Sequence, residues 1–297
     1  MLEPVCTVSS LAADEPLIGS APDARAWVCL EQPGPWGRKA FTSSHLDPVL
    51  GAEIERLAAA HGIRPSLVRR PGRHAVDAHL MAAPMVLVAH TDPADPWLLT
   101  GNLDSAADIL ELDWAAVAAG DAEAVIASLP TLTRAAEEQL LVCTNGTRDT
   151  CCALFGRLSV TPAAAAHPGR VWEVTHTSGH RFAPTTVMLP SGYLHGRVAA
   201  SADLLTAATG GRLVLDGLRG RSTWTGAGQV AEEAVRRTED ITALHDLCVT
   251  AADDDWLVTH RDGRTWLVRV STTVSGERAE SCGKDLKPVT RYEARIL

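Results

Sequence analysis

The sequence has no excess of basic residues. Its 27 lysine and arginine side chains are outnumbered by 36 aspartates and glutamates, which gives a formal net charge of −9. Nucleic acids and anionic membranes bind mainly to clustered cations, because those cations neutralise phosphate charge. We therefore expect no nucleic-acid partner and no membrane partner, whereas a basic protein partner is compatible with this charge.

Long apolar runs are also missing. No run reaches the roughly 18 residues that a transmembrane helix needs. The first 26 residues contain four acidic side chains and lack the basic and then apolar segments of a secretory signal. We therefore expect a cytoplasmic protein. Because that compartment is reducing, its seven cysteines are not expected to form a disulfide framework, and clustered cysteines favour metal binding or catalysis.

Several motifs of known chemistry are absent as well. The chain has no Gly-x-Ser-x-Gly motif of serine hydrolases and no His-Glu-x-x-His motif of zinc proteases. Gly226 and Gly228 lack the third spaced glycine of a phosphate-binding loop. The sequence therefore does not indicate a serine hydrolase, a zinc protease of this type or a phosphate-binding loop.

What the sequence does contain is an alternation of strand-like and helix-like segments. Apolar residues make up 46% of its 297 residues and charged residues 21%, which is typical of a globular chain with a sizeable core. The alternation predicts an α/β fold. We predict an N-terminal α/β domain over residues 1–135, a second domain over 136–222 and a small C-terminal α+β extension over 223–297. The order of elements from about 138 to 210 suits a thioredoxin-like unit.

Three of the seven cysteines lie in one short segment, LVCTNGTRDTCCALFGR, residues 141–157. Cys143 ends a predicted buried strand, and Cys151 and Cys152 follow a polar turn. Two cysteines that flank a turn can bring their sulfur atoms together. The cluster is compatible with a metal site, with buried structural cysteines, or with a thiol-redox or nucleophilic site.

Two histidines follow the next predicted strand, in VWEVTHTSGHRFAP. His176 and His180 can face one centre if the three residues between them turn sharply. The carboxyl ends of neighbouring parallel strands share one edge of a sheet, so we expect the thiols and imidazoles to converge there. Such donors suit Zn²⁺ or an iron–sulfur cluster with two histidine ligands. The eight residues between Cys143 and Cys152 make a long spacing for a structural zinc finger.

These motifs resemble those of the sucrase/ferredoxin-like family, a group of thioredoxin-like ferredoxins. The family pattern has two cysteines separated by eight residues with Arg-Asp between them, followed by His-x₃-His with flanking Gly and Arg/Lys-Phe-Ala. The matching positions here are Arg148-Asp149, Gly179 and Arg181-Phe182-Ala183. AWVCLEQPGPWG and LPSGYLHGRV are also similar, so the resemblance runs from about residue 26 to at least residue 197.

The resemblance implies a thioredoxin-like ferredoxin domain that carries a [2Fe–2S] cluster. Carried over to this sequence, the ligands of the cluster are Cys143, Cys152, His176 and His180. Cys151 is the alternative to Cys152, which we prefer because it preserves the eight-residue spacing. Three charged side chains are candidates for tuning the ligands: Glu173, Asp149 and Arg148.

A cluster of this type implies one-electron transfer between a protein donor and a protein acceptor. Neutral imidazoles in place of two thiolates make the cluster less negative, which raises its reduction potential and couples reduction to protonation. We therefore expect an electron carrier more than an enzyme with its own substrate. The alternatives are a structural Cys₂His₂ zinc module and a thiol-disulfide oxidoreductase that uses Cys143 with Cys151 or Cys152.

Three residues outside this set carry separate expectations. Cys29 lies in an apolar strand and is expected in the core. His195 is expected to be a half-buried strand residue rather than a ligand. Cys282 is expected near a glycine turn, with some exposure and no sign of reactivity.

Overall fold

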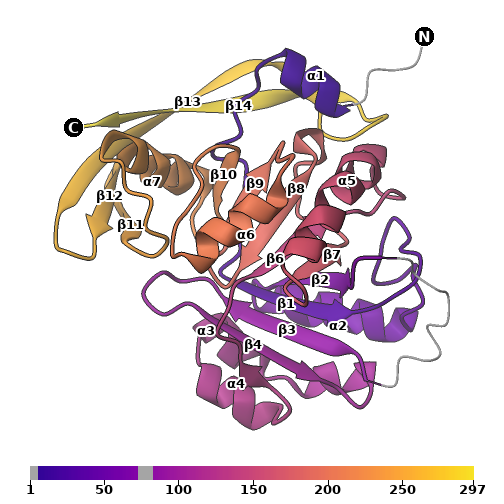
Figure 1. Ribbon diagram of the computed structural model, residues 1–297. Helices are drawn as coiled ribbons and strands as arrows, with labels where there is room; N and C mark the ends of the chain where they lie inside the picture. Colours follow the sequence, from indigo (N-terminus) through magenta and orange to yellow (C-terminus); the bar gives the residue numbers. More distant parts are fainter. Residues whose placement is uncertain (1–5, 73–82) are drawn as a thin grey trace.

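The computed structural model describes residues 6–72 and 83–297 and has a mixed α/β fold (Figure 1). Ten strands form one large mixed sheet, in the order β10-β9-β8-β6-β7-β2-β1-β3-β4-β5, and the last four strands form a separate antiparallel sheet. The strands of the large sheet are β1 (Ala26–Glu31), β2 (Arg64–Arg69), β3 (Met85–His90), β4 (Trp97–Asn102), β5 (Thr133–Arg134), β6 (Gln139–Cys143), β7 (Val171–Val174), β8 (Thr185–Leu189), β9 (Tyr193–Gly196) and β10 (Leu218–Arg221).

Helices of varied length connect these strands and cover the sheet. They are α1 (Cys6–Ala12), α2 (Pro48–Ala60), η2 (Ala106–Glu111), α3 (Trp114–Ala119), α4 (Ala122–Ser128), α5 (Thr150–Ala166), η3 (His180–Phe182), α6 (Ser201–Thr209) and α7 (Gly226–Thr238). None of the helices within residues 6–72 and 83–297 is both long and apolar enough to cross a bilayer.

The large sheet continues through the predicted border between residues 135 and 136. β2 pairs with β7 in antiparallel orientation, with Val68 opposite Val174 and Arg69 opposite Glu173. We call this β2–β7 pairing the seam of the sheet. On one side of the seam β1 pairs in parallel with β2, and on the other side β6 pairs in parallel with β7. The strands of segments 1–135 and 136–222 therefore belong to one sheet, while the domain borders themselves stay predictions.

The two halves of the sheet are covered by different helices. Alternate side chains of β1, β2 and β3 pack with α2, η2, α3 and α4, whereas alternate side chains of β6 and β7 pack with α5 and α6. The remaining faces of both halves share one apolar cluster, which joins Trp27 and Leu87 to Leu141 and Trp172. Because successive side chains of a strand point to opposite faces, this arrangement buries both faces of the central strands.

Local signals in the sequence set several helix ends. Asp47 caps α2, since its carboxylate accepts hydrogen bonds from the backbone N–H of Val49 and Leu50, at 2.8 and 3.1 Å. α6 has no side-chain cap. Ser201 is the first helical residue of α6, and its hydroxyl donates instead to the carbonyl of Ser159, at 3.0 Å.

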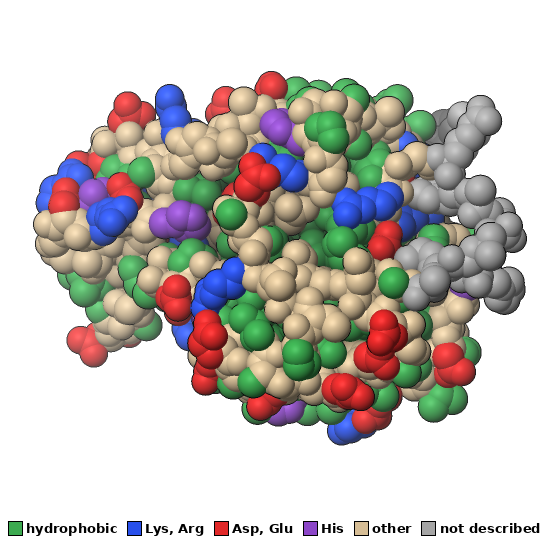
Figure 2. Space-filling view, turned by 60° about the horizontal axis from the view of Figure 1, so that its bottom comes forward, with side chains coloured by type: hydrophobic (Ala, Val, Ile, Leu, Met, Phe, Trp, Pro, Cys, Tyr) green, Lys and Arg blue, Asp and Glu red, His purple; other side chains and the backbone are tan. Residues whose placement is uncertain are grey.

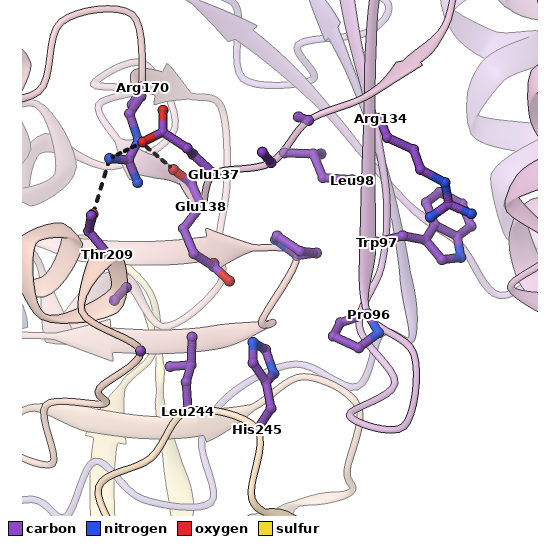
Figure 3. A pocket seen from close by; sticks show the side chains of 15 residues that line it. Pro96, Trp97, Leu98, Arg134, Glu137, Glu138, Arg170, Thr209, Leu244 and His245 are labelled. Atoms are coloured by element: carbon purple, nitrogen blue, oxygen red, sulfur yellow. Dashed lines mark hydrogen bonds and ion pairs between the residues drawn. The ribbon is translucent and has the colours of Figure 1, made fainter.

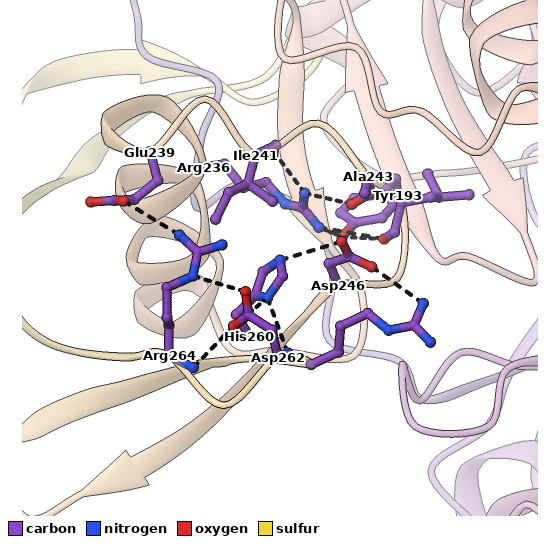
Figure 4. Close-up of polar contacts among 11 residues, drawn as sticks. Tyr193, Arg236, Glu239, Ile241, Ala243, Asp246, His260, Asp262 and Arg264 are labelled. Atoms are coloured by element: carbon purple, nitrogen blue, oxygen red, sulfur yellow. Dashed lines mark hydrogen bonds and ion pairs between the residues drawn. The ribbon is translucent and has the colours of Figure 1, made fainter.

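The C-terminal sheet is attached to the large sheet through α7. Its strands are β11 (Leu247–Ala252), β12 (Asp255–His260), β13 (Thr265–Ala279) and β14 (Leu286–Ile296). Arg236 of α7 is fully buried, forms an ion pair with Glu232 and donates to the Tyr193 hydroxyl of β9, at 2.8 Å (Figure 4). β13 and β14 form a long hairpin that lies alongside α1 (Figure 1).

Charge is distributed unevenly over the surface. Exposed acidic side chains gather on the layer of η2, α3 and α4, which faces the viewer in Figure 2: Asp104, Glu111, Asp113, Asp121 and Glu123. A cleft of about 470 Å³ separates β4 from the end of α6 (Figure 3). Arg170 spans one wall of this cleft by donating to the Glu138 carbonyl and the Thr209 hydroxyl, both at 3.1 Å. None of the predicted site residues lines it.

Candidate metal centre

Cys143 ends β6 as predicted, at the edge of the sheet where β7 also ends. Its parallel partner in the register is Val174, the last residue of β7. The side chain is buried, and its thiol donates to the Thr175 carbonyl, at 3.8 Å. α5 packs directly on this strand end, because a side chain at Gly156 would overlap the Cys143 carbonyl oxygen. The strand end is therefore tightly enclosed.

Asp149 fixes the first turn of α5. One of its carboxylate oxygens accepts the backbone N–H of Cys151, at 2.9 Å, which caps the helix. Cys151 and Cys152 follow on this turn and are both fully buried. Consecutive residues of a helix point about 100° apart, since one turn takes about 3.6 residues. The two neighbouring thiols therefore face different surroundings.

The segment between the two histidines makes the sharp turn that their convergence on one centre requires. Ser178 and Gly179 have φ angles of 60° and 65°, two consecutive residues in the left-handed region. This turn brings the rings of His176 and His180 into a stack, with centroids 4.6 Å apart and planes 25° apart. Arg219 supports the turn by donating to the carbonyl oxygens of residues 177 and 178, at 3.3 and 3.2 Å.

The four predicted ligands lie next to one another in a row. Cys143 and Cys152 belong to the same buried cluster of side chains. Cys152 Sγ lies 3.2 Å from His180 Nδ1, and the His180 ring stacks on His176. Asp149, Cys152 and His180 form a compact group whose ligand atoms all lie within 4.8 Å of one another. Cys143 and His176 adjoin the two ends of this buried group, which could hold a metal.

Burial keeps both imidazoles neutral. It lowers the pKa of His176 to about 2, with a further contribution from His180, and it lowers the pKa of His180 to about 4 despite the opposing effect of Asp149. A neutral imidazole has a free nitrogen lone pair, which a metal ion requires. Interaction between the two thiols lowers the pKa of Cys143 and raises the pKa of Cys152. These donors suit a soft or borderline metal.

The imidazole end of the row reaches the surface, whereas the thiol end does not. His176 and His180 line a cleft of about 930 Å³, and the two cysteines do not. Most charged side chains along this cleft are basic: Arg38, Lys39, Arg148, Arg181, Arg278, Lys284 and Lys287. Two acidic side chains, Glu280 and Asp285, also line it. The chain is acidic overall, but this opening is basic.

The three candidates for tuning the ligands lie around the site, and Arg148 lines the same cleft as His176 and His180. Asp149 belongs to the compact group with Cys152 and His180. Glu173 accepts hydrogen bonds from the Thr144 hydroxyl, at 2.7 Å, and from Arg69. Thr144 directly follows Cys143, so Glu173 holds the turn that carries this thiol.

The structure confirms two further expectations and corrects one. Cys29 is fully buried in the core, as predicted. His195 is fully buried rather than half-buried, and its Nε2 lies 2.9 Å from the Val214 carbonyl. Cys282 is partly exposed, as expected, and its thiol lies 3.4 Å from those of Cys6 and Cys151. No spacing rule links these three cysteines, so sequence reasoning missed the contact.

The fold and the site define a mixed α/β protein with a buried cysteine, histidine and aspartate cluster at one edge of its large sheet, a cluster that could hold a metal. A family model, Sucrase/ferredoxin-like, matches residues 17–226, more than half of the chain. The chain therefore belongs to the sucrase/ferredoxin-like family. No match was found among curated proteins or among solved structures.

Proposed function

We propose that the protein is an electron carrier with a [2Fe–2S] cluster bound by Cys143, Cys152, His176 and His180. The observation that carries the proposal is the contact of Cys152 with His180 and of His180 with His176, beside Cys143 in the same buried cluster, in a chain of this family. Two buried thiols and two neutral imidazoles are donors that such a cluster accepts.

The bound cluster would supply reversible one-electron redox chemistry. The protein would hold the thiol end away from solvent and present the imidazole end to the basic cleft. Arg219 lies buried beside the histidine turn, and its hydrogen bonds go to carbonyl and hydroxyl groups of Ser20, Thr177 and Ser178. A buried cation at this place favours the addition of negative charge to the site, so it would help the site to accept an electron.

The basic cleft supports a proposal about the partners. We expect the protein donor and the protein acceptor to dock there through acidic surfaces, because complementary charge accelerates encounter and fixes orientation. The two histidines line this cleft, so docking would bring the partner to the imidazole end of the site. The compartment that we propose is the cytoplasm, where all seven cysteines stay reduced unless they bind metal.

Spectroscopy and metal analysis test this function. Protein purified without oxygen is expected to be coloured, to contain two irons and two sulfides per chain, and to give a paramagnetic resonance signal after one-electron reduction. Its reduction potential is expected to fall with rising pH, and His180→Cys is expected to lower the potential while the cluster is kept.

The two alternatives predict different results. A colourless protein that holds zinc at Cys143, Cys152, His176 and His180 would contradict the proposal, because Zn²⁺ has no visible absorption. Thiol-disulfide exchange that persists in both His176→Ala and His180→Ala would favour an oxidoreductase instead. Matched tests on Cys248→Ser, at a thiol remote from this row, control for nonspecific effects of losing a cysteine.

A further inference from the structure

Three other cysteines form a second cluster beside the candidate metal centre. The sulfur atoms of Cys6, Cys151 and Cys282 lie 3.4 to 3.5 Å from one another, so they form a nearly equilateral triangle. They come from the first residue of α1, the first turn of α5 and the turn between β13 and β14. The three cysteines are 131 to 276 positions apart in the sequence, so the fold and not sequence proximity brings their sulfur atoms together.

Most of this cluster lies outside the part of the chain that the family model matches. Cys6 precedes residue 17 and Cys282 follows residue 226, so only Cys151 belongs to the matched segment. Cys152, the next residue, contacts His180 instead. The triangle is therefore distinct from the four residues proposed to bind the iron–sulfur cluster.

A buried carboxylate completes the group. The oxygens of Asp149 lie 3.7 to 4.0 Å from the sulfur atoms of Cys6 and Cys282, and all four side chains have ligand atoms within 4.8 Å of one another. Asp149 is held there by hydrogen bonds from the N–H of Cys151, the hydroxyl of Ser281 and the N–H of Cys282, at 2.8 to 2.9 Å. Oδ2 accepts two of these bonds, from Ser281 and Cys282, whereas Oδ1 accepts the Cys151 N–H and has a second lone pair for a metal ion.

The dimensions fit one metal ion. With Zn–S bonds of about 2.3 Å, two thiolates on a tetrahedral Zn²⁺ are about 3.8 Å apart, and a carboxylate oxygen at about 2.0 Å lies about 3.5 Å from each sulfur. The observed separations differ from these values by only a few tenths of an ångström. Three sulfur atoms this close together can all bind the same metal ion. Thiolates that bind different irons of a cluster lie farther from one another. Three thiolates with a carboxylate favour Zn²⁺ over the softer Cu(I).

We propose that Cys6, Cys151, Cys282 and Asp149 bind one structural Zn²⁺ ion. Binding displaces the three thiol protons, and the ion holds α1 and the β13–β14 hairpin on the start of α5. The apolar contacts at this junction are few, since its buried cluster contains only Cys6, Cys151 and Ala183, with Phe155 and Cys282 packed against it. Arg278, Lys284 and Lys287 of the hairpin line the basic cleft, so the ion also fixes one wall of that cleft.

Metal analysis of separate variants tests this site independently of the iron–sulfur proposal. The full-length, iron-loaded protein is expected to hold one zinc per chain, with a zinc absorption edge that indicates three sulfur ligands and one oxygen ligand. Cys6→Ser and Cys282→Ser are expected to lose the zinc and keep the iron and the visible bands. Cys143→Ser is expected to lose the iron and keep the zinc, and Cys248→Ser is the matched control that keeps both.

Several results would overturn the zinc site. The first is a zinc content below a tenth of an ion per chain after incubation with excess Zn²⁺. The second is zinc that stays bound in the Cys6→Ser variant. The third is a disulfide between two of the three cysteines, found in non-reducing peptide maps. Zinc lost from Cys143→Ser but not from Cys6→Ser would contradict the iron–sulfur proposal as well, because the ion would then sit on the other ligands.

Two measurements cover the case in which Cys6→Ser does not fold. Cys6→His is expected to fold and keep zinc, since imidazole replaces thiolate at structural zinc sites. In the wild-type protein, Cys6, Cys151 and Cys282 are expected to resist alkylation until a chelator removes the zinc, while the partly exposed Cys248 reacts at once. Equal reactivity of all four thiols before chelation would refute the site.

Discussion

Glu173 joins the candidate metal centre to the seam of the large sheet, which makes it a sensitive position for substitution. Its carboxylate accepts two hydrogen bonds from Arg69 across the seam, at 2.6 and 2.8 Å, and one from the Thr144 hydroxyl, at 2.7 Å. Both charged side chains are almost fully buried, with 7% and 5% exposed. Glu173→Gln keeps the shape of the side chain but removes its charge, so Arg69 is left buried without its anionic partner.

The expected cost follows from the burial of the pair. Removing one partner of a buried ion pair typically costs about 3–5 kcal/mol, because the other charge stays out of water. For a chain of this size, that corresponds to a fall in Tm of roughly 10 °C. Arg69→Met combined with Glu173→Gln is expected to recover at least ~1 kcal/mol, since it removes the orphaned charge and a methionine can still pack on Trp36.

Urea unfolding at pH 7, followed by circular dichroism, measures these differences. The matched control is Glu137→Gln, which removes a carboxylate that is 59% exposed and paired with Arg170; surface pairs of this kind contribute about 0–1 kcal/mol. A loss below ~1 kcal/mol for Glu173→Gln, or a double variant no more stable than the single one, would refute the reasoning. Separate transitions for the two halves of the sheet would also contradict the role of this seam.

Three further changes test other parts of the structure. Arg236→Met is expected to destabilise the protein by about 3–5 kcal/mol in urea unfolding, because it leaves Glu232 buried without its cation; a cost below ~1 kcal/mol would contradict this role. Burial lowers the pKa of His195 to about 4, below the ~6.5 of the unfolded chain, so protons favour unfolding as pH falls through this window. The wild-type protein is therefore expected to lose about 2 kcal/mol more than His195→Gln between pH 7 and pH 5, and equal losses would show that this histidine is not buried and neutral. Arg219→Gln is expected to lower the reduction potential by about 70 mV, the effect of one charge about 10 Å away at an effective dielectric constant near 20; an unchanged potential in electrochemical titration would remove Arg219 from the proposed mechanism.

Local patterns in the sequence predict much of the edge of the sheet that carries the site. Cys143 ends a strand, the strand that precedes His176 runs parallel to it, and the Thr-Ser-Gly segment turns sharply. Each of these features depends on residues close in sequence.

Long-range features could not be predicted in this way. The pairing of β2 with β7 joins residues more than a hundred positions apart, and no turn or spacing signals it. The complete burial of His195 depends on the loop around Val214, which supplies its hydrogen-bond partner. Cys6 and Cys282 meet Cys151 only because α1 and the β13–β14 hairpin lie against the start of α5.

The neighbouring cysteines at the start of α5 connect these observations. A helix directs adjacent side chains about 100° apart, so Cys151 and Cys152 cannot both face the histidines. Cys152 contacts His180, Cys151 contacts Cys6 and Cys282, and Asp149 lies within reach of both groups. An ion bound on the Cys151 side would therefore hold the same helical turn that positions Cys152. We expect release of iron from the Cys6→Ser variant to be faster than from the wild-type protein at equal chelator concentration, although none of the proposed cluster ligands is changed.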